Sequence, residues 1–270
     1  MISNLLLKIR LIRVVLNYLV KMIVELKTVI SHNGISLIFS TPNGWSYTRA
    51  ISLATKEPET IEWINSFSEN YIFWDIGSNV GVYSLYAAAK HNNIQIFAFE
   101  PSCFNLELLA RNIHNNKFND RIVVIPFAIS NYTSFDKIIY SSTEWGGALN
   151  TYKEKYTHDG SLLKYKFESI IPSMDLDKLV DVFDLETPDA IKIDVDGIEH
   201  LIINGANKLL KDKSLKTILI EVNDKFDLQS STITKSLNEF GFTLYSKSHA
   251  EWADNSDESK TSFNQIWYRQ

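Results

Sequence analysis

The sequence has little cysteine, no excess of basic charge and no long apolar run, and each absence excludes a class of protein. The single cysteine, Cys103, excludes an intrachain disulfide and a zinc site built from several cysteines. This fits a reducing compartment, so we expect a cytoplasmic protein. Since 27 Lys and Arg stand against 32 Asp and Glu, the electrostatic footprint of a nucleic-acid-binding protein is missing, and no nucleic-acid partner is expected.

The stretch from Met1 to Ile30 is rich in Leu, Ile and Val, but charges interrupt it too often for the ~20 apolar residues that span a bilayer. No small-residue cleavage site follows, as a signal peptide requires. At helical spacing one stripe carries the polar residues Arg10, Arg13, Asn17, Lys21 and Glu25. This pattern is typical of a basic amphipathic helix.

Two interpretations of that helix stay open. It packs on its own domain or on a dimer partner, or it lies on an anionic membrane surface and gives residues 1–30 a peripheral contact at the inner membrane face. The sequence does not indicate an oligomeric state.

The chain divides into an N-terminal extension, residues 1–54, and one large domain, residues 55–270. In the extension, Asn43-Gly44 between the β-rich runs Ile35–Ser40 and Tyr47–Leu53 predicts a β-hairpin cap. Pro58 suits the first turn of a helix that continues through Phe67.

From Tyr71 onward, short apolar runs alternate with helical stretches, which indicates an α/β fold with a doubly wound, mostly parallel sheet. The predicted strands are Ile72–Ile76, Ile94–Phe99, Ile122–Pro126, Ala190–Val195 and Thr217–Val222. The predicted helices are Val80–His91, Asn105–Asn115, Glu199–Lys211 and Ser231–Phe240. Two more strands, Phe135–Ser142 and Lys166–Ile171, bracket a polar insert from Thr143 to Gly160, and Phe242–Tyr245 with Phe263–Tyr268 predict a terminal antiparallel hairpin.

The segment Asp75-Ile-Gly-Ser-Asn-Val-Gly81 places a glycine turn between a strand and a helix. Gly77 permits close backbone approach, and Ser78, Asn79 and Gly81 lead into a helix N-terminus that offers unpaired N–H groups to a polar ligand. Asp75 is positioned to hold an ammonium group. The alternative is an ordinary strand-to-helix turn with glycine for steric reasons.

The next strand ends in Glu100-Pro101, which puts a carboxylate where ribose hydroxyls bind in Rossmann-type sheets. Nicotinamide-dependent oxidoreductases use the same device, and they remain a rival class. Their pyrophosphate requires G-x-G-x-x-G, whereas this turn has an acid two residues before its first glycine. A carboxylate there repels a pyrophosphate and attracts an ammonium, so S-adenosylmethionine is the better match.

A third strand delivers Asp194 and Asp196 to the same sheet edge, where either can act as the base that removes a hydroxyl proton during methyl transfer. The alternative is that both only cap the following helix. Glu199 and His200 are expected in a solvated first turn. Glu221 with Asp224 and Asp194 could hold a divalent cation, but no spacing rule demands one and no metal is expected.

The insert offers Trp145, Gly146 and Gly147, and the polar stretch near the C-terminus offers Trp252, as residues that stack on or frame a sugar ring. Packing within the loops themselves is the alternative for these aromatic residues. With Glu221, Trp145 and Gly146 form the predicted acceptor side.

With these motifs in place, the chain resembles the FkbM-type methyltransferases over roughly Lys56 to Arg269. The resemblance is carried by six motifs: KEPET at Lys56–Thr60, DIGSNVG at Asp75–Gly81, FEP at Phe99–Pro101 with Asn105 and Asn112, IKIDVDG at Ile191–Gly197, NGA at Asn204–Ala206, and the closing NQIWYR. Two departures occur: Ser78 stands where the family more often has Ala, and Asp196 where it more often has Glu.

The resemblance implies a Rossmann-like class I methyltransferase with a seven-stranded sheet and S-adenosylmethionine as cofactor. It implies that the cofactor is lined by Asp75, Gly77, Asn79, Gly81, Glu100 and Asn105, with Asp194 next to the reacting centre; Ser78, Pro101 and Ala128 are placed beside them. The implied acceptor is a sugar hydroxyl in glycan or glycolipid biosynthesis. A non-sugar natural product and a scaffold without turnover stay open as alternatives.

Overall fold

The computed structural model describes residues 2–153, 166–249 and 261–270. Its centre is a seven-stranded sheet in the order β12-β13-β11-β10-β3-β4-β5. The strands are β3 (Ile72–Ile76), β4 (Gln95–Phe99), β5 (Ile122–Ile125), β10 (Ala190–Ile193), β11 (Thr217–Asn223), β12 (Phe242–Ser248) and β13 (Ser262–Arg269). Neighbouring strands run parallel except at β13, which is antiparallel to both β11 and β12. This confirms the predicted mostly parallel sheet with a terminal antiparallel pair.

Two apolar cores lie on opposite faces of this sheet, because side chains alternate along each strand. On β3, Phe73 points into one core and Trp74 into the other. The first face is covered by α3 (Pro58–Asn65), α4 (Val82–Lys90) and α5 (Cys103–Asn115), and the second by α6 (Leu176–Phe183), α7 (Glu199–Asn204) and α8 (Asp227–Glu239). Covering helices on both faces explain the nearly continuous apolar strands.

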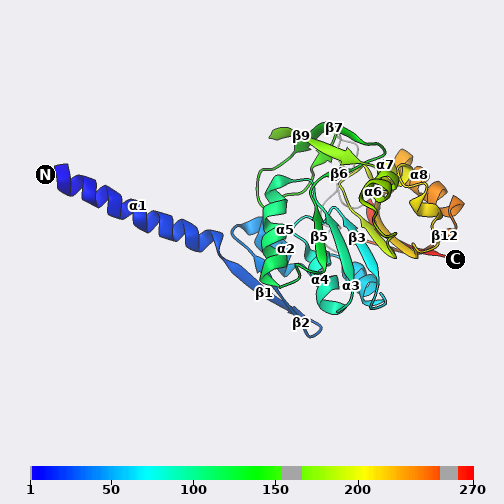
Figure 1. Ribbon diagram of the computed structural model, residues 1–270, viewed down its shortest axis with the longest axis horizontal. Coiled ribbons are helices and arrows are strands. Elements are labelled where there is room, and N and C mark those ends of the chain that lie inside the picture. Colours follow the sequence, from blue (N-terminus) through cyan, green and yellow to red (C-terminus); the bar gives the residue numbers. More distant parts are fainter. Residues whose placement is uncertain (1, 154–165, 250–260) are drawn as a thin grey trace.

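The N-terminal region differs from its prediction. Helix α1 (Ile2–Val24) ends before Ile30 and projects away from the body (Figure 1), and the hairpin pairs β1 (Lys27–His32) with β2 (Ile35–Ser40) around Asn33-Gly34. The hairpin predicted at Asn43-Gly44 is wrong: this stretch opens α2 (Gly44–Ile51). The side chain of Asn43 caps that helix by accepting from the Ser46 amide at 3.0 Å. Asn before Gly serves both a tight turn and a helix cap, which is the physical reason for the error.

A second, four-stranded sheet has the order β6-β9-β7-β8. It comprises β6 (Ala128–Ile129), β7 (Ser134–Tyr140), β8 (Thr151–Tyr152) and β9 (Phe167–Met174), so the two extra predicted strands pair with each other as β7 and β9. The predicted insert is therefore partly a strand at β8, and its residues 154–160 lie outside the described part.

Helix α7 ends at Asn204, earlier than predicted, and only the short 3₁₀ turn Leu209–Lys211 follows. Gly205 breaks the helix where the chain passes close to the second sheet: a Cβ there would lie 2.7 Å from the carbonyl oxygen of Ser130. Helix α8 starts four residues before the predicted Ser231.

Candidate functional site

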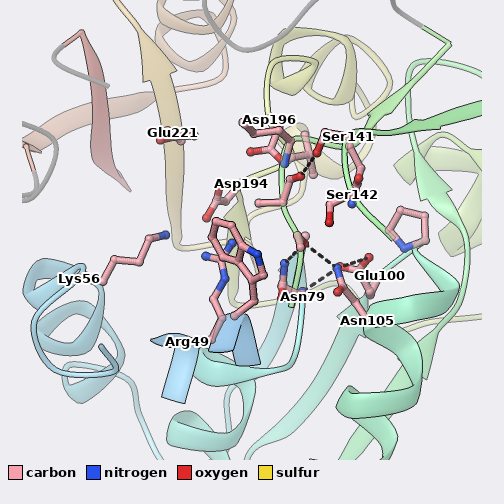
Figure 2. A pocket seen from close by; sticks show the side chains of 18 of the residues that line it. Arg49, Lys56, Asn79, Glu100, Asn105, Ser141, Ser142, Asp194, Asp196 and Glu221 are labelled. Atoms are coloured by element: carbon pink, nitrogen blue, oxygen red, sulfur yellow. Dashed lines mark hydrogen bonds between the residues drawn. The ribbon is translucent and has the colours of Figure 1, made fainter. Parts of the chain in front are cut away.

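A cavity of about 600 Å³ opens at the carboxyl ends of β3, β4, β10 and β11 (Figure 2). Its size lies within the range of small-molecule sites, and its position is the one that ligands take in open α/β sheets. Parallel strands with their helices on both faces create such a crevice. The N-terminal elements contribute Arg49 and Lys56 to one side, and Ser141 and Ser142, directly after β7, contribute to another.

The glycine turn after β3 forms the floor of the cavity. Its amides at Gly77 and Ser78 both donate to the carbonyl oxygen of Phe99, at 3.0 and 2.9 Å. Gly77 has φ +87°, and a Cβ at this position would lie 1.8 Å from the carbonyl oxygen of Asp194. Only glycine lets the ends of β3 and β10 approach this closely.

Glu100 presents its carboxylate to the cavity immediately after β4. It accepts hydrogen bonds from the backbone amides of Asn79 and Ser102, each at 2.8 Å, and from the side-chain amide of Asn105 at 3.5 Å. Burial raises the pKa of Glu100 to about 7, against the opposing effect of these donors. The carboxylate is therefore fixed in place, with acceptor capacity left for ligand hydroxyls.

A small, mainly apolar hollow of about 40 Å³ adjoins the cavity and shares Gly77, Pro101 and Asn150 with it. Phe127 and Ala128 line its apolar wall. The side-chain oxygen of Asn150 is buried there and has no hydrogen-bond partner among the described residues. At this size the hollow has room for about one water, so it can receive only the edge of a flat group that is bound in the main cavity.

Beneath the cavity lies a buried lysine, Lys192, which is 1% exposed. Its ammonium contacts a carboxylate oxygen of Asp194 at 2.7 Å and lies 5.0 Å from the ring centre of Tyr83. Burial lowers the pKa of Lys192, but the charges of Asp194, Glu57 and Asp75 outweigh this effect and raise it. Burial likewise acts to raise the pKa of Asp194, and the Lys192 charge overcomes it and holds that pKa below the usual range.

Glu221 lines the cavity one strand away from Asp194, because Ile220 is paired with Ile193 across β11 and β10. Burial, together with the charges of Asp194 and Glu199, raises the pKa of Glu221 well above its ordinary value. The pKa of Asp194 is therefore lowered and that of Glu221, on the neighbouring strand, is raised. This arrangement is expected where one carboxyl group stays charged and the other exchanges a proton.

The insert between β7 and β8 folds over the cavity and is tied down at several points. The carbonyl oxygen of Gly147 accepts from the side-chain amides of Asn79 and Asn105, at 2.9 and 3.1 Å, as the dashed lines in Figure 2 show. The amide of Leu149 donates to Asp196 at 2.7 Å. Arg49 donates to the carbonyl oxygen of Gly146 at 3.2 Å. The insert is thus anchored to the glycine turn and to the end of β10.

Of the predicted residues, seven line the main cavity: Gly77, Asn79, Glu100, Pro101, Asn105, Asp194 and Asp196. Glu221 joins them from the predicted acceptor side, and Ala128 lines the adjoining hollow. Asp196 accepts a hydrogen bond from the Leu149 amide of the insert. It is not the N-cap of the following helix, which is Ile198.

Asp75, predicted to hold an ammonium, does not reach the cavity. It is 1% exposed and lies two residues before Gly77, on the inner side of the cavity floor. Its carboxylate accepts a hydrogen bond from the Ser84 hydroxyl at 2.6 Å. The two-residue period of β3 explains this placement, since Gly77 takes the next position on the same face and fills the floor. Asp75 instead belongs to the charges around Lys192.

Four further predicted residues support the site from outside the cavity. Ser78 donates to Phe99 at 3.3 Å, and Gly81 caps α4, where a Cβ would lie 2.5 Å from Leu109. Trp145 donates to Glu107 at 3.1 Å, and the amide of Gly146 donates to Asn105 at 3.0 Å. Gly147 lines the cavity in their place. Trp252 lies outside the described residues.

Glu199 and His200 are buried, at 1% and 8% exposure, so the predicted solvated turn is wrong. The Glu199 carboxylate accepts from the amides of Val195 and Gly197, both at 3.1 Å, and from Gln229. Burial raises the pKa of Glu199 to about 7. It therefore shapes the loop that carries Asp194 and Asp196. Asp224, the third carboxylate of the hypothetical cation site, instead pairs with Lys247 at 2.5 Å.

Sequence reasoning missed Lys192, Arg49 and Lys56. A lysine inside the apolar run AIKID was the available signal for the first, because a charge in a doubly covered strand must have a buried partner. Lys56 opens the KEPET motif of the resemblance, but no role was drawn from it, and nothing local marks Arg49; both reach the cavity through the packing of α2 and of the segment before α3.

Comparisons with known proteins place this geometry in context. A family profile described as Methyltransferase FkbM domain matches residues 75–250. The hexuronic acid methyltransferase AglP of Haloferax volcanii is 27% identical over 171 residues, and the match covers 63% of each chain, less than two thirds of that relative. Methyltransferase sdnD of Sordaria araneosa is 23% identical over 210 residues, with 70% of this chain and 80% of sdnD covered.

Two solved structures share the fold. Methyltransferase FkbM of Methylobacillus flagellatus superposes with a TM-score of 0.51 at 14% identity, over 75% of this chain and 44% of that one. A SAM-dependent methyltransferase from Streptococcus mutans gives a TM-score of 0.52 at 13% identity, over 90% of this chain and 55% of that one.

Proposed function

The chain belongs to the FkbM methyltransferase family, and on this premise we propose that it methylates a hydroxyl group of a saccharide. It is a methyltransferase and its cofactor is S-adenosylmethionine. The observation that carries the saccharide proposal is the polar lining of the cavity beyond Asp194, supplied by hydroxyl and amide side chains: Ser141, Ser142, Ser248, Ser262 and Asn264. The hexuronic acid substrate in the name of the Haloferax relative supports it.

The residues present fit the cofactor. The part of the main cavity beside this hollow, where Pro101 and Ala128 form an apolar wall and Asn150 offers an unpartnered oxygen, suits an adenine ring and its amino group. Glu100 has the free acceptor capacity that ribose hydroxyls need. We assign the ammonium group to Asp194 rather than to Asp75, because Asp194 lines the cavity and Lys192 keeps it ionised. When bound, S-adenosylmethionine supplies an activated methyl group on a sulfonium.

We assign proton removal from the acceptor hydroxyl to Glu221. Asp194 is a weak proton acceptor because the neighbouring ammonium of Lys192 stabilises its charged form. The raised pKa of Glu221 brings this carboxyl closer to the operating pH, which favours general base catalysis. Since Glu221 acts only when ionised, turnover should rise as the pH increases through its pKa.

Incubation of the protein with labelled S-adenosylmethionine and fractionated glycans from its source tests the acceptor. Label on a saccharide is expected, and label only on protein or on small metabolites rejects the proposal. Uronic-acid-containing glycans and neutral glycans should be assayed separately, because the Haloferax relative acts on a hexuronic acid.

Glu221→Gln tests the base. We expect turnover to fall about 10²–10⁴-fold while S-adenosylhomocysteine affinity changes less than about threefold, because the charge acts on the acceptor and not on the cofactor. Asp224→Asn is the matched control, since it removes a carboxylate just beyond the same strand and outside the cavity. Undiminished turnover in Glu221→Gln would reject this role.

A further inference from the structure

In helix α1, the large apolar side chains from Ile12 to Ile23 are exposed to solvent. Figure 1 shows it extending from the body beyond the β1-β2 hairpin. From Ile12 to Ile23, nine large apolar side chains are between 47% and 64% exposed: Ile12, Val14, Val15, Leu16, Tyr18, Leu19, Val20, Met22 and Ile23. A single-chain protein seldom leaves so large a contiguous apolar surface in water, so this helix has a binding partner.

The apolar arc of α1 is too wide for one neighbouring helix. Between Ile12 and Val24 its polar residues are Arg13, Asn17 and Lys21, which recur every four positions and therefore lie within roughly 80° of the circumference. Apolar residues occupy most of the remaining arc. A two-stranded coiled coil buries only a narrow stripe at positions a and d and would leave much of this arc in water. A lipid boundary, into which a helix sinks, covers a wide arc.

Charge is divided unevenly between this region and the rest of the chain. Residues 1–56 contain seven basic residues and one acidic residue, Glu25. Of the chain's 27 basic and 32 acidic residues, 20 and 31 follow, so the remainder is strongly acidic. An anionic surface therefore attracts the N-terminal region and repels the body, and this fixes which side of the molecule faces it.

Two exposed apolar side chains lie on the elements that follow α1, and one of them lines the cavity. Val29 on β1 is 62% exposed, and Trp45 on α2 is 56% exposed and lines the cavity. The Thr41 amide donates to the carbonyl oxygen of Leu26 at 2.8 Å, which holds the start of α2 beside the end of α1. Tryptophan favours the membrane interface, where its ring is partly apolar and partly hydrated.

We propose that α1 lies along the surface of an anionic phospholipid bilayer, with its apolar arc in the headgroup region and Trp45 at the boundary. In the part of the chain that the structure describes, no helix is long and apolar enough to cross a bilayer. The contact is peripheral and brings the mouth of the cavity next to the lipid surface. This inference is independent of the proposed saccharide acceptor, because it rests on α1 and not on the chemistry of the cavity.

Vesicle flotation of the full chain tests the proposal. Vesicles of phosphatidylcholine alone should leave the protein unbound, and vesicles with about a third phosphatidylglycerol should float it, with binding lost at about 0.5 M salt. Failure to bind the anionic vesicles overturns the proposal. A protein that stays unbound and runs as a dimer identifies a second copy as the partner and overturns it as well.

Two matched variants separate charge from burial. Leu19→Glu and Asn17→Glu each add one negative charge to α1, but only Leu19→Glu, which lies opposite the polar stripe, interrupts the apolar arc. We expect Leu19→Glu to weaken vesicle binding at least about tenfold more than Asn17→Glu does. Equal effects of the two substitutions would contradict insertion. Thermal protection of both variants by S-adenosylhomocysteine, equal to that of the wild type, shows that the body is folded.

Discussion

Lys192→Met keeps the length of a buried side chain and deletes the charge that neutralises the carboxyls beneath the cavity. Lys192 contacts Asp194 at 2.7 Å, and the charges of Glu57 and Asp75 also act on it. Removing one partner of a buried ion pair costs about 3–5 kcal/mol, because the other charge remains buried and uncompensated. The total stability of a domain is about 5–15 kcal/mol, so a large fraction is at stake.

In a domain of this size, each kcal/mol shifts the thermal midpoint by about 2–4 °C, so we expect a fall of roughly 6–20 °C near neutral pH. The fall should depend on pH. Burial acts to raise the pKa of Asp194, and Lys192 is the largest charge that opposes it. We therefore expect Lys192→Met to raise this pKa above its unfolded value, so that the folded variant binds a proton that the unfolded chain has lost. That contribution is present at low pH and is lost as the pH rises, so the gap between variant and wild type should widen from pH 5 to pH 8.

Thermal unfolding followed by circular dichroism at both pH values measures this gap. Adding Asp194→Asn to Lys192→Met should restore part of the lost stability, because the uncompensated charge is removed as well. An equal gap at both pH values, together with no recovery in the double variant, would refute the assignment of Lys192 as the counter-charge of Asp194.

Three further substitutions test other parts of the site. Glu100→Gln should weaken S-adenosylhomocysteine binding about 10–100-fold by calorimetry, because a charged acceptor is lost; unchanged affinity contradicts the ribose assignment. Asp196→Ala removes the acceptor of the Leu149 amide at 2.7 Å and should speed proteolysis of residues 141–150 about fivefold; an unchanged rate argues against an anchoring role. Gly77→Ala should lower the free energy of urea unfolding by more than about 2 kcal/mol, whereas Gly241→Ala, with a similar φ and open space around it, should cost only the backbone strain of about 1–2 kcal/mol. Equal losses would show that the contact with Asp194 is unimportant.

The sheet and the cofactor edge follow from local signals. Apolar runs such as Ala190–Ile193 are long enough to indicate buried strands, and the polar residues after them, Glu100 and Asp194, occur where parallel strands must end together. The strands and the polar residues at their carboxyl ends could be predicted because the order of residues along the chain and the two-residue period of a strand can both be read from the sequence.

The predictions were wrong where the same local sequence is compatible with two structures, or where the packing of distant segments determines whether a side chain is buried. Asn33-Gly34 and Asn43-Gly44 are the same dipeptide, yet one makes a hairpin turn and the other starts a helix. Asp75 and Glu199 are charged, which suggested ligand contact for the first and exposure for the second, yet both are buried. The Ser84 hydroxyl and the Lys192 charge stabilise Asp75. Backbone amides stabilise Glu199. Such compensation comes from distant segments.

The two asparagines that hold the insert have a consequence for how the enzyme assembles its substrates. Asn79 and Asn105 flank the cofactor turn, and both donate to the carbonyl oxygen of Gly147. A cofactor that shifts either amide shifts the insert above the acceptor side. By thermodynamic linkage, the acceptor then changes cofactor affinity by the same factor. Asn79 and Asn105 are therefore the two side chains through which the binding of cofactor and acceptor can be coupled.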